Sequence, residues 1–197
     1  MNDQVPRGNN PNCALFPVVL KVPEFIRELP LPRRVKALGG LAREKVGMAA
    51  RRAGVSIAEV SVAVQGQPLP LCGVHWSLTH KPFYVAGVVS LCPVGIDIEC
   101  IKPVSAGLFA RICRQEEAAL FHGVSRETIF FRCFTAKEAV LKRHGVGLAA
   151  LGAVRVRQIP DSGHLDVSYE DTLTRVEQLE VDGHMLSITG DRADVLW

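Results

Sequence analysis

The sequence lacks, or has few of, the features that identify a metal-binding, nucleic-acid-binding or membrane protein directly. Among its 197 residues there is no Cys-x-x-Cys pair, so a zinc ribbon or finger has no support. Aromatic residues make up only 6% and the formal net charge is only +3, without a basic segment interleaved with aromatics. These values argue against a nucleic-acid partner. No apolar run approaches the ~20 residues of a membrane span, so we expect no membrane partner either.

The first thirteen residues, MNDQVPRGNNPNC, are polar and rich in turn formers. They lack the apolar segment of a secretory signal, so we expect a flexible tail over residues 1–13 and a cytoplasmic protein. In such a protein the six cysteines are expected to be reduced thiols. The composition of the whole chain, with 48% apolar and 22% charged residues, is typical of a globular protein.

The first part of the chain predicts one long helix among short strands. The helix covers residues 32–56, with Pro32 in its first turn and Gly54 at its end. Its apolar stripe comprises Val35, Leu38, Ala42, Val46, Ala49 and Ala53. The pair Gly39-Gly40 costs about 1 kcal/mol per residue relative to alanine, which predicts a close approach by another segment. Strands are predicted at 14–22, 58–66, 74–80, 83–90 and 93–99, the last three as an antiparallel meander.

The second part predicts two helices followed by strands. The helices cover residues 105–122 and 125–144, and Gly145 is the expected end of the second. Alternating segments with Gly-containing turns between them predict strands at 153–159, 164–169, 175–181 and 184–190. The fold class is therefore α+β, with two halves of similar content over residues 14–100 and 101–197, each combining antiparallel sheet with helices.

The segment PVGIDIE, residues 93–99, sets two carboxylates on one strand face. Because side chains alternate along a strand, Asp97 and Glu99 point the same way. They fit the solvated face of an edge strand. They also fit a cation site, because two carboxylates ~4 Å apart repel by ~4 kcal/mol at a protein-surface dielectric and a divalent ion reverses that sign. Gly95 on the same face is expected to leave room for a ligand.

The segment FTAKEAVLK, residues 134–142, places an acid and a base on one helix face. Glu138 and Lys142 are four residues apart and therefore one turn from each other. Thr135 and Glu138 also fit a capping box, which would give this glutamate a structural role. In a functional interpretation, Glu138 adds a third carboxylate to a magnesium site and Lys142 contacts a phosphate.

A third segment, WSLTH at residues 76–80, ends a predicted strand with Thr79 and His80. This pair suits an anion at the strand end, although a single histidine there is also compatible with a purely structural role. In order and spacing, WSLTH, VGIDIE and FTAKEAVLK followed by GVGL resemble the 4′-phosphopantetheinyl transferase superfamily. Its two diagnostic motifs, G-[IV]-D-x-[ED] and [FW]-x-x-K-E-[AS]-x-x-K, are both present in full, and the match is dense over residues 74–148.

The resemblance implies an enzyme that moves the 4′-phosphopantetheine arm of coenzyme A to a serine of an apo carrier protein, releasing 3′,5′-ADP. The cofactor would be magnesium, with manganese as an alternative. By matching position, the metal ligands would be Asp97, Glu99 and Glu138, the catalytic residues Glu138 and Lys142, and the coenzyme A ligands His80, Thr79, Lys142, Lys45 and Lys36. For Lys36 and Lys45, ordinary solvated helix charges are the alternative.

The length resembles the longer, surfactin-synthetase-activator-like type of this superfamily. That type implies a pseudo-twofold monomer with the active site between its two halves. It commonly has Gly-Lys-Pro where this chain has Gly66-Gln67-Pro68, so one basic contact to coenzyme A is either missing or supplied by another residue.

The resemblance also implies an acidic acyl or peptidyl carrier protein as partner. The segment LFARICRQEEAALF is either a docking surface or a helix packing inward, and its docking residues would be Leu108, Phe109, Arg111, Ile112 and Arg114. Two other functions remain compatible with the sequence. One is a non-catalytic protein of the same fold that binds coenzyme A or a carrier, and the other is an unrelated magnesium-dependent phosphate-ester enzyme.

Overall fold

The computed structural model describes residues 14–55, 73–190 and 195, and the α+β class is confirmed. Helices are α1 Glu24–Arg27, α2 Leu31–Arg52, α3 Ala106–Ile112, α4 Gln115–Ala118, α5 Arg126–Arg143 and the 3-10 helix η1 Leu148–Ala153. Strands are β1 Val18–Lys21, β2 His75–His80, β3 Tyr84–Ser90, β4 Ile96–Cys100, β5 Arg155–Asp161, β6 His164–Tyr169, β7 Thr172–Val181 and β8 His184–Thr189. The predicted tail 1–13, the predicted strand 58–66 and the Gly66-Gln67-Pro68 segment lie outside the described residues.

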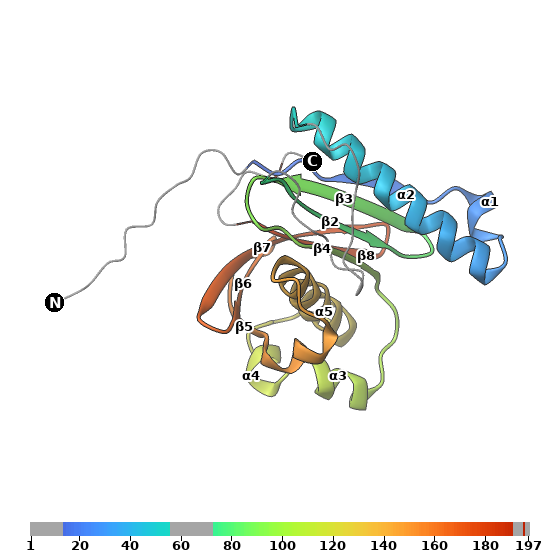
Figure 1. Ribbon diagram of the computed structural model, residues 1–197. Helices are drawn as coiled ribbons and strands as arrows, with labels where there is room; N and C mark the ends of the chain where they lie inside the picture. The colour runs from blue at the N-terminus through green and yellow to red at the C-terminus, as the bar shows by residue number, and fades with distance from the viewer. Residues whose placement is uncertain (1–13, 56–72, 191–194, 196–197) are drawn as a thin grey trace.

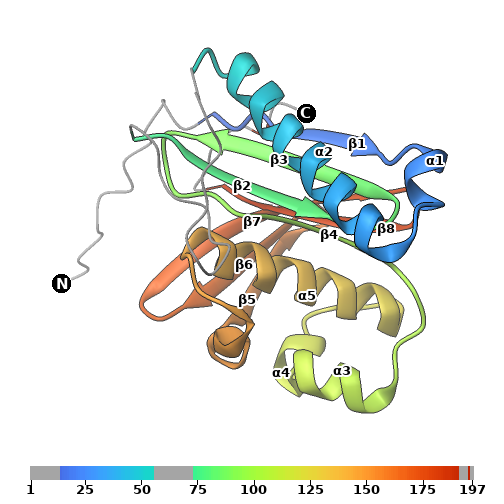
Figure 2. The same cartoon turned by 45° about the vertical axis from the view of Figure 1, so that its right-hand side comes forward.

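Two antiparallel sheets lie between two long helices (Figure 1). The three-stranded sheet has the order β1-β3-β2, and the five-stranded sheet has the order β4-β8-β7-β6-β5. Helix α2 covers the outer face of the first sheet and α5 covers the outer face of the second, as Figure 2 also shows. The aliphatic side chains of β3, β4 and β8 fill the layer between the sheets. Within the described ranges, no helix combines the length and apolar character that a membrane span requires.

The meander predicted for residues 74–99 is wrong in its last strand. β2 pairs with β3, but β4 pairs with β8, so that Asp97 lies opposite Ser187. The aliphatic face of β4, Ile96 and Ile98, is fully buried between the sheets. If β4 were a further strand of the first sheet, its aliphatic face would not be buried in this way, because the burial comes from stacking one sheet on the other.

Helix α2 ends as predicted, with Gly54 in the left-handed region at φ +68°. The predicted apolar stripe is buried from Leu38 to Ala49 and Ala53 is partly buried, but Val35 is 50% exposed, contrary to the prediction. No other segment approaches Gly39-Gly40 closely among the described residues. The close approach occurs instead at Gly87 of β3, where an added Cβ would lie 2.4 Å from the backbone nitrogen of Val46.

The second part of the chain follows the prediction with one break. Helix α5 covers Arg126–Arg143, and Gly145 follows it at φ +64°. The helix predicted over 105–122 is divided into α3 and α4, because the Glu117 carboxylate accepts a hydrogen bond from the Arg114 backbone N–H and starts a new helix there.

Cys92 is disulfide-bonded, so the prediction of reduced thiols is wrong for this residue. Cys100, Cys113 and Cys133 are free.

Candidate active site

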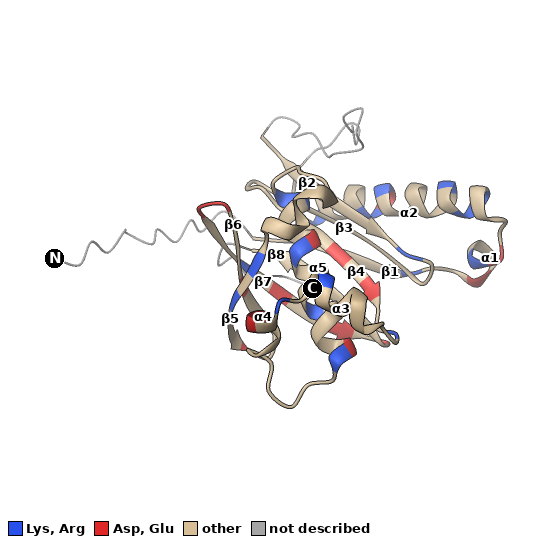
Figure 3. Ribbon diagram, turned by 90° about the horizontal axis from the view of Figure 1, so that it is seen from below, with Lys and Arg blue, Asp and Glu red and all other residues tan. Residues whose placement is uncertain are grey.

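Three carboxylates converge where β4 meets α5. Asp97, Glu99 and Glu138 each offer an oxygen within 4.8 Å of the other two. Asp97 is fully buried, whereas Glu99 and Glu138 are half-buried. Figure 3 shows the acidic stretch of β4 beside the charged residues of α5. The structure thus brings together the three residues that the motifs proposed as metal ligands.

The buried carboxylate of Asp97 is satisfied on one oxygen only. Its Oδ1 accepts hydrogen bonds from the Thr79 hydroxyl at 2.9 Å and from Lys142 Nζ at 2.7 Å. Its Oδ2 is buried, and no described residue hydrogen-bonds to it. Buried carboxylate oxygens are normally paired, and an unpaired one among other carboxylates is a ligand that a hard divalent cation accepts. The donor set therefore fits magnesium or manganese.

Lys142 joins the two sheets at this site. Its Nζ donates to Ile96 O at 2.8 Å and to Leu78 O at 3.5 Å, in addition to Asp97. One ammonium group therefore contacts both β2 and β4, and the Lys142 side chain is 27% exposed. Thr79 is 3% exposed, and its hydroxyl contacts Asp97 from the neighbouring sheet.

Burial, together with the neighbouring acids, changes the protonation of Glu138. Burial raises the pKa of Glu138 to about 7, and the charges of Asp97 and Glu99 add to this effect. Lys81 lies on the other side, with Nζ 2.5 Å from Glu99 Oε1. Burial alone would lower the pKa of Lys81, but the carboxylates of Asp97 and Glu99 outweigh it and raise the pKa. The cluster thus holds more negative charge than its own lysines neutralise.

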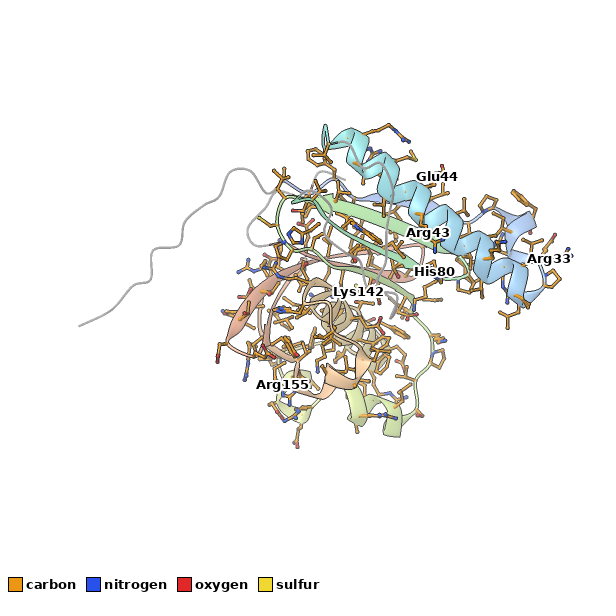
Figure 4. All side chains as sticks on the ribbon, in the orientation of Figure 1. Arg33, Arg43, Glu44, His80, Lys142 and Arg155 are labelled. Atoms are coloured by element: carbon orange, nitrogen blue, oxygen red, sulfur yellow. The ribbon has the colours of Figure 1, made fainter. Side chains whose placement is uncertain are left out.

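Basic side chains from the first sheet and its helix surround His80. Burial lowers the pKa of His80, and the charges of Lys142 and Lys81 lower it further, with a smaller effect of Arg43. Figure 4 shows His80 between Arg43 of α2 and Lys142 of α5. A neutral histidine beside several cations leaves positive potential suited to phosphate oxygens.

Two site residues were missed by sequence reasoning. Lys81 lies between the strands predicted at 74–80 and 83–90, and its position directly after His80 is the available signal. Arg43 had no signal, because nothing separates it from the six other basic residues of α2. Of the two predicted lysines of this helix, Lys36 is exposed, whereas Lys45 is 5% exposed and donates to Glu44 Oε1 at 2.9 Å.

Gly95 has a different role from the predicted one. An added Cβ would lie 1.9 Å from Ala139 O and 2.8 Å from Arg143 N, so the space beside Gly95 is filled by the backbone of α5 rather than by a ligand. The capping box is also wrong, because Thr135 lies inside α5 and its hydroxyl contacts Phe131 O and Ser187 Oγ. Glu138 therefore has no capping role.

A cavity of about 200 Å³ adjoins the cluster at the end of α5. Lys142 lies between the two, because it lines this cavity and also contacts Asp97. Burial lowers the pKa of His75 at the cavity wall, and Arg143 lowers it further. The complete lining comprises His75, Trp76, Pro93, Val94, Lys142, Arg143, His144 and Gly145.

We expect magnesium binding to strengthen as the pH rises to about 7 and to level off above it. Below that pH Glu138 holds a proton, because its pKa is raised to about 7, and a cation must displace this proton. The apparent affinity should fall about tenfold per pH unit below the pKa. Calorimetric titrations with Mg²⁺ from pH 5.5 to 8 measure this slope, and Glu127→Gln, near the start of α5 and not part of the cluster, should retain it. A flat wild-type profile would contradict the role of Glu138 as a ligand.

The fold and the site define a class of protein. It is an α+β protein whose two sheets meet at a carboxylate cluster that fits a divalent cation, with basic side chains that fit phosphate beside it. Residues 93–184 match the family model of the 4′-phosphopantetheinyl transferase superfamily. The matched segment is a little under half of the chain, and the resemblance predicted from the two motifs is confirmed.

Three similar proteins carry the same name. The 4′-phosphopantetheinyl transferase ffp of Bacillus subtilis is 28% identical over 127 residues, which are 61% of this chain and 56% of that protein. The 4′-phosphopantetheinyl transferase psf-1 of Bacillus pumilus is 37% identical over 78 residues, 38% of this chain and 34% of that protein. Another 4′-phosphopantetheinyl transferase of Bacillus subtilis is 30% identical over 131 residues, 62% of this chain and 58% of that protein. The chain thus spans less than two thirds of the length of each relative.

Proposed function

We propose that this protein transfers the 4′-phosphopantetheine arm of coenzyme A to a serine of an apo carrier protein and releases 3′,5′-ADP. The observation that carries the proposal is the meeting of Asp97, Glu99 and Glu138 within 4.8 Å, with Lys142 bonded to the same cluster. Both diagnostic motifs contribute to it, one from β4 and the other from α5. The names of the similar proteins support the same reaction.

Asp97, Glu99 and Glu138 would hold magnesium or manganese, with Asp97 Oδ2 available as one ligand atom. The chemistry that such a cation supplies when bound is neutralisation of charge on the diphosphate. Lys142 and His80 would contact phosphate oxygens of coenzyme A, and Arg43 would add positive charge on the α2 side. Thr79 orients Asp97 through its hydroxyl.

In the reaction, the serine Oγ forms a bond to the β-phosphorus of coenzyme A, and the bond from that phosphorus to the oxygen of 3′,5′-ADP breaks. Lys142 stabilises the negative charge that develops on the leaving group. The serine proton goes to Glu138 or to a water next to it.

We further propose that the chain is a monomer of two related halves, 14–100 and 101–197, with the site between them. Each half places one long helix across one face of an antiparallel sheet, and the contact of Lys142 with both β2 and β4 lies at their junction. On α3, Leu108 is 44% exposed and Arg111 is exposed, whereas Ile112 is buried. The proposed docking surface for an acidic carrier therefore rests on Leu108, on Arg111 and on the exposed Arg114 before α4, with Phe109 half-buried beside them.

Mass spectrometry of an apo carrier protein tests the proposal. The carrier is incubated with this protein, coenzyme A and Mg²⁺, and a gain of one phosphopantetheine mass on the serine is the expected result. Omission of Mg²⁺ and addition of a chelator should abolish the gain. Binding of coenzyme A or carrier without transfer would indicate a non-catalytic protein. Hydrolysis of simple phosphate esters without a need for coenzyme A would indicate an unrelated enzyme.

A further inference from the structure

A lysine outside both diagnostic motifs faces the carboxylate cluster. Lys81 follows the last residue of β2, and its Nζ lies 2.5 Å from Glu99 Oε1. Both side chains are largely shielded from solvent, with exposed fractions of 29% for Lys81 and 17% for Glu99. The attraction between the two charges is therefore stronger than in an ion pair on the open surface, because less water screens it. Lys81 belongs to the electrostatics of the site, although the proposed reaction gives it no role.

The two carboxylates of β4 each have a lysine of their own. Lys142 Nζ lies 2.7 Å from Asp97 Oδ1, and Lys81 pairs with Glu99. Glu138 brings a third carboxylate within 4.8 Å of these two acids. Two ammonium groups leave this cluster with at most one uncompensated negative charge. Removing Lys81 would leave two such charges close together, which raises both the repulsion within the cluster and its attraction for a cation.

The two lysines differ in how firmly they are held. Lys142 Nζ is fixed by two backbone carbonyls in addition to Asp97. Among the described residues, Lys81 Nζ forms an ion pair with Glu99 alone. The main chain of Lys81 is fixed, because its backbone N–H donates to Tyr84 O at 2.8 Å in the β2–β3 turn. The Lys81 side chain can therefore leave Glu99 by rotation of its own bonds, with no movement of the strands.

A divalent cation and Lys81 require the same carboxylate. Glu99 is one of the three acids whose oxygens lie close enough together to share a cation. A cation that binds Glu99 repels the ammonium group beside it, and the ammonium group in turn lowers the attraction of Glu99 for the cation. The ion pair and the binding of a divalent cation therefore oppose each other.

We propose that Lys81 is an internal counter-cation that competes with the divalent cation for Glu99. It pairs with Glu99 at low cation concentration and is displaced from it as the cation binds. The proposal rests on the metal site of the proposed function and adds to it a residue that neither motif contains. Lys81 acts through Glu99 and is thus a positioning residue, which lowers the affinity of the site for magnesium and stabilises the cluster when magnesium is scarce.

Calorimetric titration of the whole protein with Mg²⁺, without coenzyme A or carrier, tests the proposal at pH 8. Lys81→Met removes the charge and keeps a long flexible side chain, so Kd for Mg²⁺ should fall on the order of tenfold. Lys81→Gln is a second neutral variant with the same expected result, and Lys81→Arg keeps the charge and should keep the wild-type Kd. Lys21→Met is the matched control, because it breaks the ion pair of Lys21 with Asp182 outside the cluster and should leave Kd unchanged.

Thermal unfolding gives a second measurement. In the presence of a chelator, Lys81→Met should have a lower Tm than the wild type, because the carboxylates repel each other with one counter-charge fewer. Saturating Mg²⁺ should raise the Tm of this variant by more than it raises that of the wild type, since tighter binding to the folded state gives greater stabilisation. A lysine with a merely structural role would lower Tm equally with and without the cation.

The outcomes separate this inference from the proposed function. Tighter Mg²⁺ binding by the two neutral variants, with wild-type Kd values for Lys81→Arg and Lys21→Met, supports the competition whether or not the phosphopantetheine arm is transferred. Unchanged or weaker Mg²⁺ binding by the neutral variants overturns it, and so does a wild type that binds no Mg²⁺. If the wild type transfers the arm and the Lys81 variants bind Mg²⁺ as it does, the enzyme assignment stands and only the competition is refuted.

Discussion

Glu138→Gln should abolish phosphopantetheine transfer while leaving the protein folded. The amide is a poor ligand for magnesium and cannot accept the serine proton, so both proposed roles of Glu138 are lost together. We expect transfer to fall about 10³-fold or more, since removing a single charge-stabilising group typically lowers kcat by ~10²–10³-fold. The rate is measured by mass spectrometry of the carrier under saturating coenzyme A and Mg²⁺.

The fold should not suffer from this substitution. Glu138 lies beside Asp97 and Glu99, and their repulsion contributes to the raised pKa, so a neutral amide relieves unfavourable charge. Glu127→Gln, the same change near the start of α5, is the matched control and should retain transfer. Near-normal activity of the Glu138 variant, with an unchanged dependence on magnesium, would refute the role of this residue.

Gly95→Ala should have the largest effect on stability. The added Cβ would lie 1.9 Å from Ala139 O, and this atom belongs to backbone, which cannot rotate away as a side chain can. Helix α5 must therefore move off β4. We expect a loss of about 3 kcal/mol in the free energy of unfolding, at the upper end of typical overpacking effects, together with loss of transfer because Glu138 moves with the helix.

Urea denaturation of Gly95→Ala measures this loss, and Gly40→Ala provides the control. Among the residues that the structure describes, no atom outside the local helix backbone lies within 4 Å of a Cβ at Gly40, and alanine favours the helix over glycine by about 1 kcal/mol. The control should therefore be more stable than the wild type. Equal stability of Gly95→Ala and the wild type would mean that α5 does not depend on this contact.

The residues of the acidic cluster could be predicted because their signals are local. Asp97 and Glu99 share a strand face by alternation, and Glu138 and Lys142 share a helix face by their spacing of four. Only the resemblance indicated that these two faces meet, since residues 97 and 138 are far apart in sequence. The meeting itself is seen in the coordinates.

Other features depend on tertiary contacts that leave no local signal. β4 follows β3 by a short turn, which favours a hairpin, yet it pairs with β8 some ninety residues later because its aliphatic face is buried between the sheets. Gly95 was interpreted as space for a ligand, whereas that space accommodates a helix backbone. The hydrogen bond from Thr79 to Asp97 and the ion pair of Lys81 with Glu99 likewise join β2 and the residue after it to β4, and the predicted meander does not place these two strands side by side.

The position of Lys142 has a consequence for how this protein tolerates change. Its ammonium group bonds to a carbonyl of β2, to a carbonyl of β4 and to a buried acid at once. Substituting Lys142 therefore removes hydrogen bonds that hold β2, β4 and α5 together, and it also removes a positive charge from the site. A genetic screen for soluble expression alone should therefore retain this lysine, and an inactive descendant of the protein would lose Glu138 sooner than Lys142.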